Sequence, residues 1–246
     1  MVEQRPVCLS VGGSDSCAGA GIQADLRVFE ALDVQGCSAI TALTAQNPEN
    51  ILHIQASSIT QFEAELQAIS SYYNVACIKT GMLYDQTHIE ALIPFIGDIP
   101  LIVDPVLIAS SNTFLFDKET AKDAYEKLIS LATLWTPNLQ EASFFLRSDI
   151  VDAQEAARLL FDAFHTPVLL KGGHKEANTL HDVLCMDGIL QTFSCQKQSL
   201  SISAAHGTGC RLASAIAAHI ALGNALPLTI KLAHRWLQSD LQQANK

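Results

Sequence analysis

Short apolar runs alternate with longer amphipathic segments along almost the whole chain, and this pattern indicates repeated strand–helix units. The apolar runs predict strands over residues 7–11, 38–43, 76–79, 101–104, 134–136 and 168–171. Apolar residues at helical spacing predict helices over 22–32, 60–73, 86–96, 117–131, 138–146, 152–164, 210–222 and 227–243. Strands that alternate with helices are typical of a mostly parallel sheet covered by helices.

The pattern changes between residues 180 and 193, where Asp187-Gly188 separates two apolar-rich runs. An Asp-Gly pair in that setting is a strong signal for a β-hairpin. We therefore predict an α/β fold whose mostly parallel sheet has an antiparallel edge. No repeat, low-complexity tract or linker-like composition divides the chain, so we interpret residues 1–246 as a single domain.

Composition narrows the classes of function. The formal net charge of -10 and the lack of a basic stretch argue against a nucleic-acid partner. No apolar run reaches the roughly 18 residues of a membrane helix, and the N-terminus lacks a signal pattern, so we expect a cytoplasmic protein without a membrane partner. The seven cysteines are scattered and never form Cys-x-x-Cys, which predicts free thiols rather than disulfides or structural zinc.

Two glycine-rich segments carry the strongest chemical signals. The segment His206-Gly207-Thr208-Gly209-Cys210 precedes a run of small residues that predicts a tightly packed helix, and a helix N-terminus after a glycine turn binds anions such as phosphate. The segment from Gly12 to Gly21 predicts a second glycine turn between a strand and a helix. Neither segment matches a P-loop or a dinucleotide fingerprint. We interpret the pair as a site for a small molecule beside a phosphate donor.

Polar residues follow several predicted strands, at the sheet edge where α/β proteins bind ligands. Asp104 precedes a proline, Asn138 and Glu141 have capping-box spacing, and Lys171 precedes two glycines. Each also has a structural interpretation: a turn cap for Asp104, a plain capping box for Asn138 and Glu141, and a solvated lysine for Lys171. Convergence of the three oxygen-bearing residues would suit Mg²⁺. Lys79-Thr80-Gly81-Met82 has the same form as the Lys171 segment, with weaker specificity.

Cys210 falls at a predicted helix start, where the helix dipole would lower a thiol pKa and nearby phosphate would oppose that shift. A buried structural cysteine is the alternative, and its position directly after Gly-Thr-Gly favours a functional role. His206 is equally compatible with a structural role beside the turn and with catalysis.

Six segments taken together resemble the hydroxymethylpyrimidine and phosphomethylpyrimidine kinases, a branch of the ribokinase-like superfamily. They are Gly12 to Ser16, Ala18 to Leu26, Ile40 to Asn47, Thr136 to Asn138, Lys171 to His174 and His206 to Cys210. The resemblance implies a three-layer α/β/α ribokinase-like fold, a homodimer, and the use of Mg²⁺ and ATP. It also implies phosphorylation of 4-amino-5-hydroxymethyl-2-methylpyrimidine and then of its monophosphate, in thiamine biosynthesis.

The resemblance also assigns residues position by position. It implies substrate contacts by Gly13, Asp25, Gln46, Met82 and Val106, an anion hole at Gly207, Thr208 and Gly209, and Cys210 as the base for the hydroxyl proton. It implies metal contacts by Asp104 and Glu141, and nucleotide contacts by Asn138 and Lys171. The role of Gln46 is chemically sensible, because a side-chain amide offers a donor and an acceptor that match an aminopyrimidine edge.

The chain departs from the family pattern at a few positions. Cys17 replaces a glycine, Arg211 replaces a small residue, and residues 109–112 lack the expected Lys-Ser-Gly. These departures keep two alternatives open: a pyridoxal kinase, and a binding protein that has lost turnover. Gln46 and the Gly-Thr-Gly-Cys segment favour the pyrimidine kinase over the former, and Asp104, Glu141, Lys171 and Cys210 speak against the latter.

Overall fold

A nine-stranded sheet forms the centre of the molecule, with strand order β3-β2-β1-β4-β5-β6-β7-β8-β9. The structure is a computed structural model that describes residues 5–108, 114–176, 179–196, 198, 201 and 205–244. The strands are β1 (Val7–Asp15), β2 (Gln35–Gln46), β3 (Ile51–Ala56), β4 (Val75–Thr80), β5 (Leu101–Val103), β6 (Leu134–Trp135), β7 (Val168–Glu176), β8 (Thr179–Met186) and β9 (Ile189–Gln196). The helices are α1 (Gly21–Ala31), α2 (Ile59–Ser70), α3 (Gln86–Ile96), α4 (Lys118–Ile129), α5 (Leu139–Leu146), α6 (Ala153–Phe164), α8 (Thr208–Ala221) and α9 (Leu226–Ala244).

The pairing of the strands confirms the predicted fold class. Strands β2, β1, β4, β5, β6 and β7 pair in parallel, whereas β8 and β9 continue the sheet in antiparallel fashion. Asp187 and Gly188, both with positive φ, form the predicted turn between β8 and β9. An additional antiparallel strand, β3, pairs with β2 at the opposite edge and was not predicted. Its apolar residues are interrupted by His53 and Gln55, and only one neighbouring strand stabilises it.

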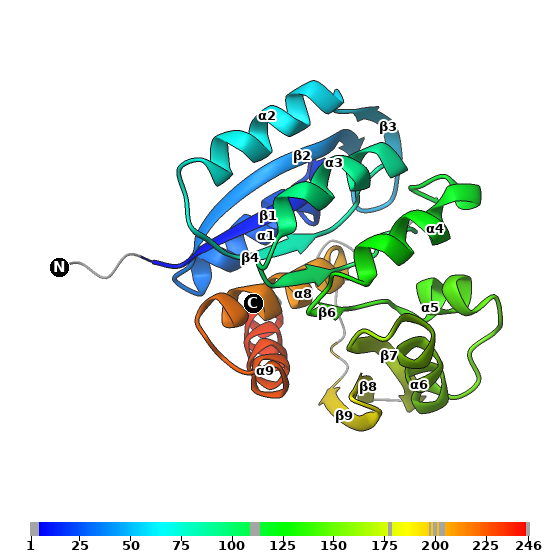
Figure 1. The fold of residues 1–246 in the computed structure, drawn as a ribbon. Helices are drawn as coiled ribbons and strands as arrows, with labels where there is room; N and C mark the ends of the chain where they lie inside the picture. Colours follow the sequence, from blue (N-terminus) through cyan, green and yellow to red (C-terminus); the bar gives the residue numbers. More distant parts are fainter. Residues whose placement is uncertain are drawn as a thin grey trace.

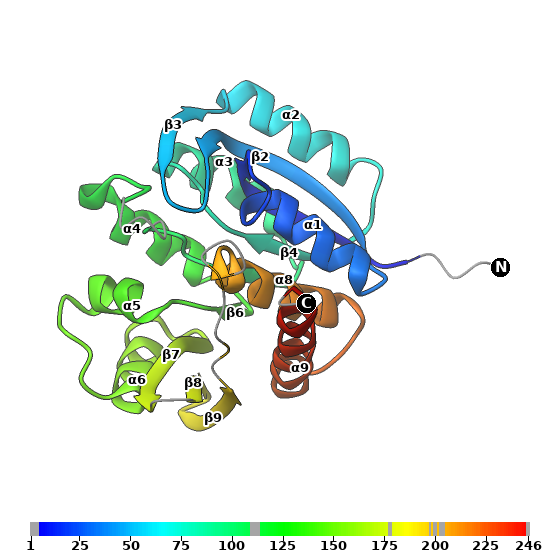
Figure 2. The ribbon, with the colours of Figure 1, turned by 180° about the vertical axis from the view of Figure 1, so that it is seen from behind.

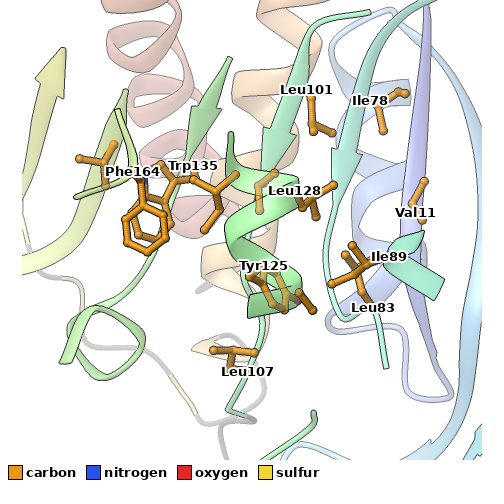
Figure 3. Packing of buried hydrophobic residues seen from close by; sticks show 14 of the residues in the cluster. Val11, Ile78, Leu83, Ile89, Leu101, Leu107, Tyr125, Leu128, Trp135 and Phe164 are labelled. Atoms are coloured by element: carbon orange, nitrogen blue, oxygen red, sulfur yellow. The ribbon is translucent and has the colours of Figure 1, made fainter. Parts of the chain in front are cut away.

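Helices cover both faces of the sheet and produce three layers (Figure 1). One face packs against α2 to α6, and the other against α1, α8 and α9, as the view from behind also shows (Figure 2). The alternation of side chains along β5 explains this division: Leu101 and Val103 enter one core, and Ile102 enters the other. Figure 3 shows the larger core, in which Trp135, Tyr125 and Leu128 pack between the sheet and its helices.

The first glycine segment differs from its prediction. Strand β1 continues through Gly12 and Gly13 to Asp15, with a register shift against β2 between the two glycines, so the turn lies at residues 16–20 instead. The two glycines serve close packing: a Cβ on Gly13 would lie 3.2 Å from the Met82 sulfur, and one on Gly12 would lie 3.6 Å from the Gly81 backbone. Gly12 and Gly13 therefore let the loop after β4 approach the end of β1.

The cysteines are free thiols, as predicted, and Cys8, Cys77 and Cys185 are buried. None of the described helices is both long enough and apolar enough to cross a membrane.

Candidate active site

A cavity of about 210 Å³ opens at the carboxyl ends of the parallel strands. Segments that end or follow β1, β2, β4, β5 and β6 line it, together with Lys171 of β7 and the first turn of α8. This is the edge where parallel α/β sheets bind ligands. All the residues predicted for the site line this one cavity: Gly13, Asp25, Gln46, Met82, Asp104, Val106, Asn138, Glu141, Lys171, Gly207, Thr208, Gly209 and Cys210.

The glycine turn predicted before α8 is present at Gly207. Gly207 is the N-cap of α8 with φ of 76°, a conformation that favours glycine, and no side chain caps the helix. A Cβ at this position would also overlap the carbonyl oxygen of Gly19, so the two glycine-rich turns lie in direct contact. The first N–H groups of a helix have no intrahelical acceptor, and here they lie at the cavity wall. The turn can therefore hold an anionic group.

Lys171 adds a positive charge beside this turn. Its ammonium group forms an ion pair with Asp104, with 2.6 Å between Nζ and Oδ1. A Cβ on Gly209 would lie only 3.3 Å from the same Nζ, so the absence of a side chain there lets the lysine and the turn converge. An anion at the N-terminus of α8 would thus meet backbone donors and an ammonium group together.

Asn138 and Glu141 combine the two interpretations offered for them. They form a capping box at the start of α5: Asn138 Oδ1 accepts from the Glu141 backbone N–H at 3.0 Å, and Glu141 Oε2 accepts from the Asn138 N–H at 2.9 Å. Glu141 is also buried at the cavity. Burial, together with the nearby Asp104 carboxylate and against the attraction of Lys171, raises the pKa of Glu141 to about 8. Two buried carboxyl groups with too little positive charge around them suit a divalent cation.

A buried ion pair between Asp25 and Lys79 forms the floor of the cavity. The Lys79 ammonium lies 2.8 and 2.9 Å from the two Asp25 oxygens, and both side chains are 1% exposed. Ser10 and Ser214 donate to the same carboxylate at 2.6 and 2.7 Å. Burial opposes the charge on Lys79, but the Asp25 carboxylate raises the pKa of the lysine above its usual value. Asp25 lines the cavity as expected, yet its oxygens are engaged by protein donors, which assigns it to holding the floor rather than to direct substrate contact.

Cys210 lies in the first turn of α8, but its acidity differs from the expectation. Burial, with contributions from Asp104 and Asp25, outweighs the attraction of Lys79 and Lys171 and raises the pKa of the thiol to about 12. The expected lowering by the helix dipole is therefore wrong for the unliganded protein, because desolvation is the larger effect. The thiol is protonated at neutral pH.

At the carboxyl end of β2 the cavity wall is apolar, and Gln46 also lines the cavity there. Met82 and Val106 belong to a small apolar cluster with Ala42 and Leu115. Gln46 ends β2, and its backbone is fixed by Ser16, whose hydroxyl group pairs with both the N–H and the carbonyl of Gln46 at 2.9 Å. This end can therefore accommodate a flat ring with a polar edge.

His206 has a partner that the sequence did not reveal. Its Nε2 lies 3.0 Å from Asp15 Oδ2, and Asp15 also accepts from the backbone N–H groups of Cys17 and Ala20. These hydrogen bonds outweigh burial and hold the pKa of Asp15 at about 2. The sequence interpretation missed or undervalued four polar residues of the site: Asp15, Lys79, Ser10 and Ser214. Of these, only Lys79 gave a signal, through the pattern Lys79-Thr80-Gly81.

Arg211 and residues 109–112, two of the departures from the family pattern, have different outcomes. Arg211 is directed to α9, where its Nη1 lies 2.8 Å from Asp240 Oδ2, and it does not line the cavity. The departure at residues 109–112 lies outside the described residues.

Comparison with known proteins agrees with this geometry. The sequence profile of the phosphomethylpyrimidine kinase family matches residues 15–246. A hydroxymethylpyrimidine/phosphomethylpyrimidine kinase from Haemophilus influenzae is 36% identical over 243 residues, which cover 95% of this chain and 90% of that protein. The crystal structure of a phosphomethylpyrimidine kinase from Clostridium difficile superposes with a TM-score of 0.81 at 28% identity, covering 96% of this chain and all of the other.

Pyridoxal kinase from Staphylococcus aureus, in complex with pyridoxal, is a further structural neighbour. It superposes with a TM-score of 0.85 at 27% identity and covers 97% of this chain and 88% of the other. Another structure of that enzyme contains both AMP-PCP and pyridoxal.

Removing the positive half of the buried ion pair should destabilise the protein strongly. We expect Lys79→Met to lower the free energy of unfolding by about 3–5 kcal/mol, because it leaves the Asp25 charge buried without a cation. Urea denaturation at pH 7 measures this change, and the double variant Asp25→Asn/Lys79→Met should recover part of the loss. As a control, Lys127→Met removes a surface pair with Glu90 and should cost less than about 1 kcal/mol. A loss for Lys79→Met as small as the control's would contradict this account of the floor.

Glu141→Gln should stabilise the unliganded protein at alkaline pH. With its pKa raised to about 8 in the folded state from an ordinary 4.5, Glu141 binds more protons folded than unfolded between those values, so its ionisation lowers stability as pH rises. Glutamine removes this penalty and can keep the capping box. We expect the variant's advantage in Tm over the natural protein to grow from pH 5 to pH 8 by on the order of 10 °C.

Thermal unfolding at a series of pH values tests this expectation. Glu119→Gln, at an exposed glutamate in the first turn of α4, is the matched control and should show no growing advantage. An advantage of Glu141→Gln that stays constant or shrinks as pH rises would rule out a raised pKa at this position.

Proposed function

Because the chain belongs to the phosphomethylpyrimidine kinase family, we propose that it phosphorylates 4-amino-5-hydroxymethyl-2-methylpyrimidine and then its monophosphate, with ATP as phosphoryl donor. One observation carries the proposal: a single cavity is lined both by an apolar cluster with Gln46 and by the glycine turn at the N-terminus of α8 with Lys171. A small alcohol and a phosphate donor can meet there.

The acceptor end is suited to an aminopyrimidine. The Gln46 amide offers a donor and an acceptor to the ring nitrogen and the exocyclic amine, and Met82 and Val106 offer apolar cover for the ring. Gly13 leaves space for Met82 beside the ring. Asp25 lies in the floor of the cavity and positions two groups there. It fixes Lys79 through their ion pair, and it fixes the first turn of α8 through Ser214.

The phosphoryl end is suited to charge neutralisation. Phosphoryl transfer passes through a loose transition state, so positioned donors contribute more than covalent chemistry. The N–H groups at Gly207, Thr208 and Gly209 and the Lys171 ammonium converge on the place where charge develops. Asn138, whose backbone forms a β-bridge with Lys171 in the cavity wall, completes the nucleotide side.

Asp104 and Glu141 are the residues that would hold Mg²⁺. Burial and the nearby Asp104 carboxylate raise the pKa of Glu141, a cation bound here would oppose that rise, and oxygen ligands beside a phosphate site are what Mg²⁺ prefers. When bound, Mg²⁺ supplies charge neutralisation to the phosphate oxygens.

Cys210 is the candidate base for the hydroxyl proton of the acceptor. Its thiol is protonated in the unliganded protein, and the carboxylates of Asp104 and Asp25 contribute to that state. Once the charge of Asp104 is neutralised in the loaded site, that carboxylate no longer raises the pKa of the Cys210 thiol. Lys79 and Lys171 then stabilise the thiolate. Because the transition state is loose, the contribution of the base is smaller than that of the anion-binding turn.

We also propose that the protein forms a homodimer and resides in the cytoplasm. Free thiols suit a reducing compartment. Leu52, on the edge strand β3, is 78% exposed, and Leu43, on the neighbouring strand β2, is 52% exposed; exposed apolar side chains of this kind suit an interface with a second copy.

A pyridoxal kinase is the second candidate, favoured by the structural neighbour that contains pyridoxal. Pyridoxal also presents a hydroxymethyl group on a nitrogen-containing ring, and a cavity of this shape does not by itself separate the two acceptors. Gln46 favours the aminopyrimidine, because only that ring carries an amine beside a ring nitrogen.

An assay of ADP release with Mg²⁺-ATP and each of three acceptors tests the proposed function. We expect turnover of hydroxymethylpyrimidine and of its monophosphate. Cys210→Ala should lower kcat about tenfold to a hundredfold and leave pyrimidine affinity, measured by calorimetry, within threefold, since the thiol serves proton transfer and the ring is held elsewhere. Turnover of pyridoxal alone would establish the second candidate, and pyrimidine binding without turnover would establish a binding protein.

Gln46→Leu should raise KM for the pyrimidine by about tenfold to a hundredfold, because the ring's polar edge would lose its partners within the cavity. Steady-state kinetics with varied pyrimidine and saturating ATP measures this effect. The KM for ATP should stay within twofold, which serves as the internal control. An unchanged KM for the pyrimidine would remove Gln46 from the substrate site.

A further inference from the structure

Three side chains of different donor type meet where the two glycine-rich turns touch, next to the contact between Gly19 and Gly207. Among the residues that the structure describes, one group of three potential metal ligands lies with all donor atoms within 4.8 Å of one another: Asp15, Cys17 and His206. We propose that this trio binds a thiophilic divalent cation of the zinc class. The proposed kinase activity does not use the trio in this way, and binding does not depend on that activity.

The distances within the trio match the spacing of ligands around such a cation. Asp15 Oδ2 lies 3.5 Å from Cys17 Sγ and 3.0 Å from His206 Nε2. Tetrahedral ligands at about 2.0–2.3 Å from zinc are roughly 3.3–3.6 Å from one another. Asp15 is therefore already at ligand spacing from the other two donors, which lie within 4.8 Å of each other, and a water molecule can take the fourth position.

The backbone holds two of the donors in place before any ion arrives. Asp15 is 1% exposed and is oriented by N–H groups of Cys17 and Ala20, at 2.9 and 2.8 Å. The His206 side chain is 9% exposed, and its ring fits only because residue 19 is glycine, since a Cβ there would overlap the ring. Cys17 is exposed, which gives an ion access from solvent. The site is thus preorganised on its buried side and open on its thiol side.

The donor set separates this site from the one suited to Mg²⁺. Thiolate and imidazole ligands select zinc-like cations, whereas Asp104 and Glu141 offer oxygen ligands alone. On binding, the Cys17 thiol loses its proton to solvent, the His206 ring exchanges the Nε2 proton that faces Asp15 for one on Nδ1, so that Nε2 is free to bind the ion, and the Asp15 carboxylate binds as it is. One proton is released for each ion bound, and the complex is neutral.

Binding also has a consequence for the anion-binding turn. His206 precedes Gly207, so an ion that joins it to Asp15 and Cys17 ties the turn at residues 16–20 to the N-terminus of α8. Both segments line the cavity. An ion at this point would restrict the turn that receives the phosphoryl group, and we expect it to inhibit turnover. This second consequence rests on the proposed function.

Titration of the reduced, metal-free full-length chain with Co²⁺, without ATP or Mg²⁺, tests the site. We expect one Co²⁺ per chain, a near-ultraviolet thiolate-to-cobalt charge-transfer band, and loss of that band when Zn²⁺ is added. Cys17→Ser should abolish the band and weaken binding at least tenfold, and His206→Asn should weaken binding by a similar factor. Cys37→Ser, at another partly accessible thiol away from the trio, should behave like the natural chain.

Each other outcome contradicts the proposal. Absence of binding to the natural chain, binding without the charge-transfer band, or a band that persists in Cys17→Ser would each exclude the trio as the site. Circular dichroism and Tm of Cys17→Ser confirm that its fold is retained. The kinase assay adds a separate readout: Zn²⁺ should inhibit the natural chain at least tenfold more strongly than Cys17→Ser. Cobalt binding in a chain without kinase activity would sustain this inference and overturn the proposed function.

Discussion

The ion pair between Asp25 and Lys79 is the interaction on which the geometry of the site depends. With Ser10 and Ser214 it joins four elements, β1, α1, β4 and α8, at one buried point beneath the cavity. Ser214 also donates to the carbonyl oxygen of Cys210 at 2.9 Å, so the first turn of α8 is fixed to the same point. A buried pair of this kind is not a strong source of stability. Its importance here is that it fixes where the anion-binding turn lies relative to the ends of the strands.

Local charge, not net charge, determines what this cavity can bind. The chain carries a formal net charge of -10, yet Lys79 and Lys171 both lie at the cavity beside an uncapped helix N-terminus. In a buried site these groups act on a ligand at short range with little screening, whereas most of the acidic surface is separated from it by solvent. An acidic protein can therefore hold a phosphate group. The cost of burying charge appears at Glu141, whose pKa is raised mainly by burial and further by the nearby Asp104 carboxylate, against the attraction of Lys171.

The sequence predicted most of the fold, because alternating strand and helix patterns and the Asp187-Gly188 turn are local signals. Strand β3 escaped prediction because its stability comes from pairing with β2 rather than from its own residues. The residues that line the cavity were expected together on two grounds: Asp104, Asn138, Glu141 and Lys171 follow parallel strands that share one edge, and the family resemblance added Gly13, Asp25, Gln46, Met82 and Val106. Their individual states were not: the pKa of Cys210 and the engagement of Asp25 depend on burial and on partners distant along the chain. Asp15 and His206 are 191 positions apart and gave no joint signal.

The most direct test of the account is a crystal structure of the chain with hydroxymethylpyrimidine and a non-hydrolysable ATP analogue. The account predicts the pyrimidine ring against Met82 and Val106 with its amine edge on Gln46, and the hydroxymethyl oxygen directed at Cys210. It also predicts the terminal phosphate at the N–H groups of residues 207–209, in contact with Lys171. A terminal phosphate bound away from the N-terminus of α8, or a pyrimidine bound outside this cavity, would contradict the central claim that one strand-end cavity holds acceptor and donor together.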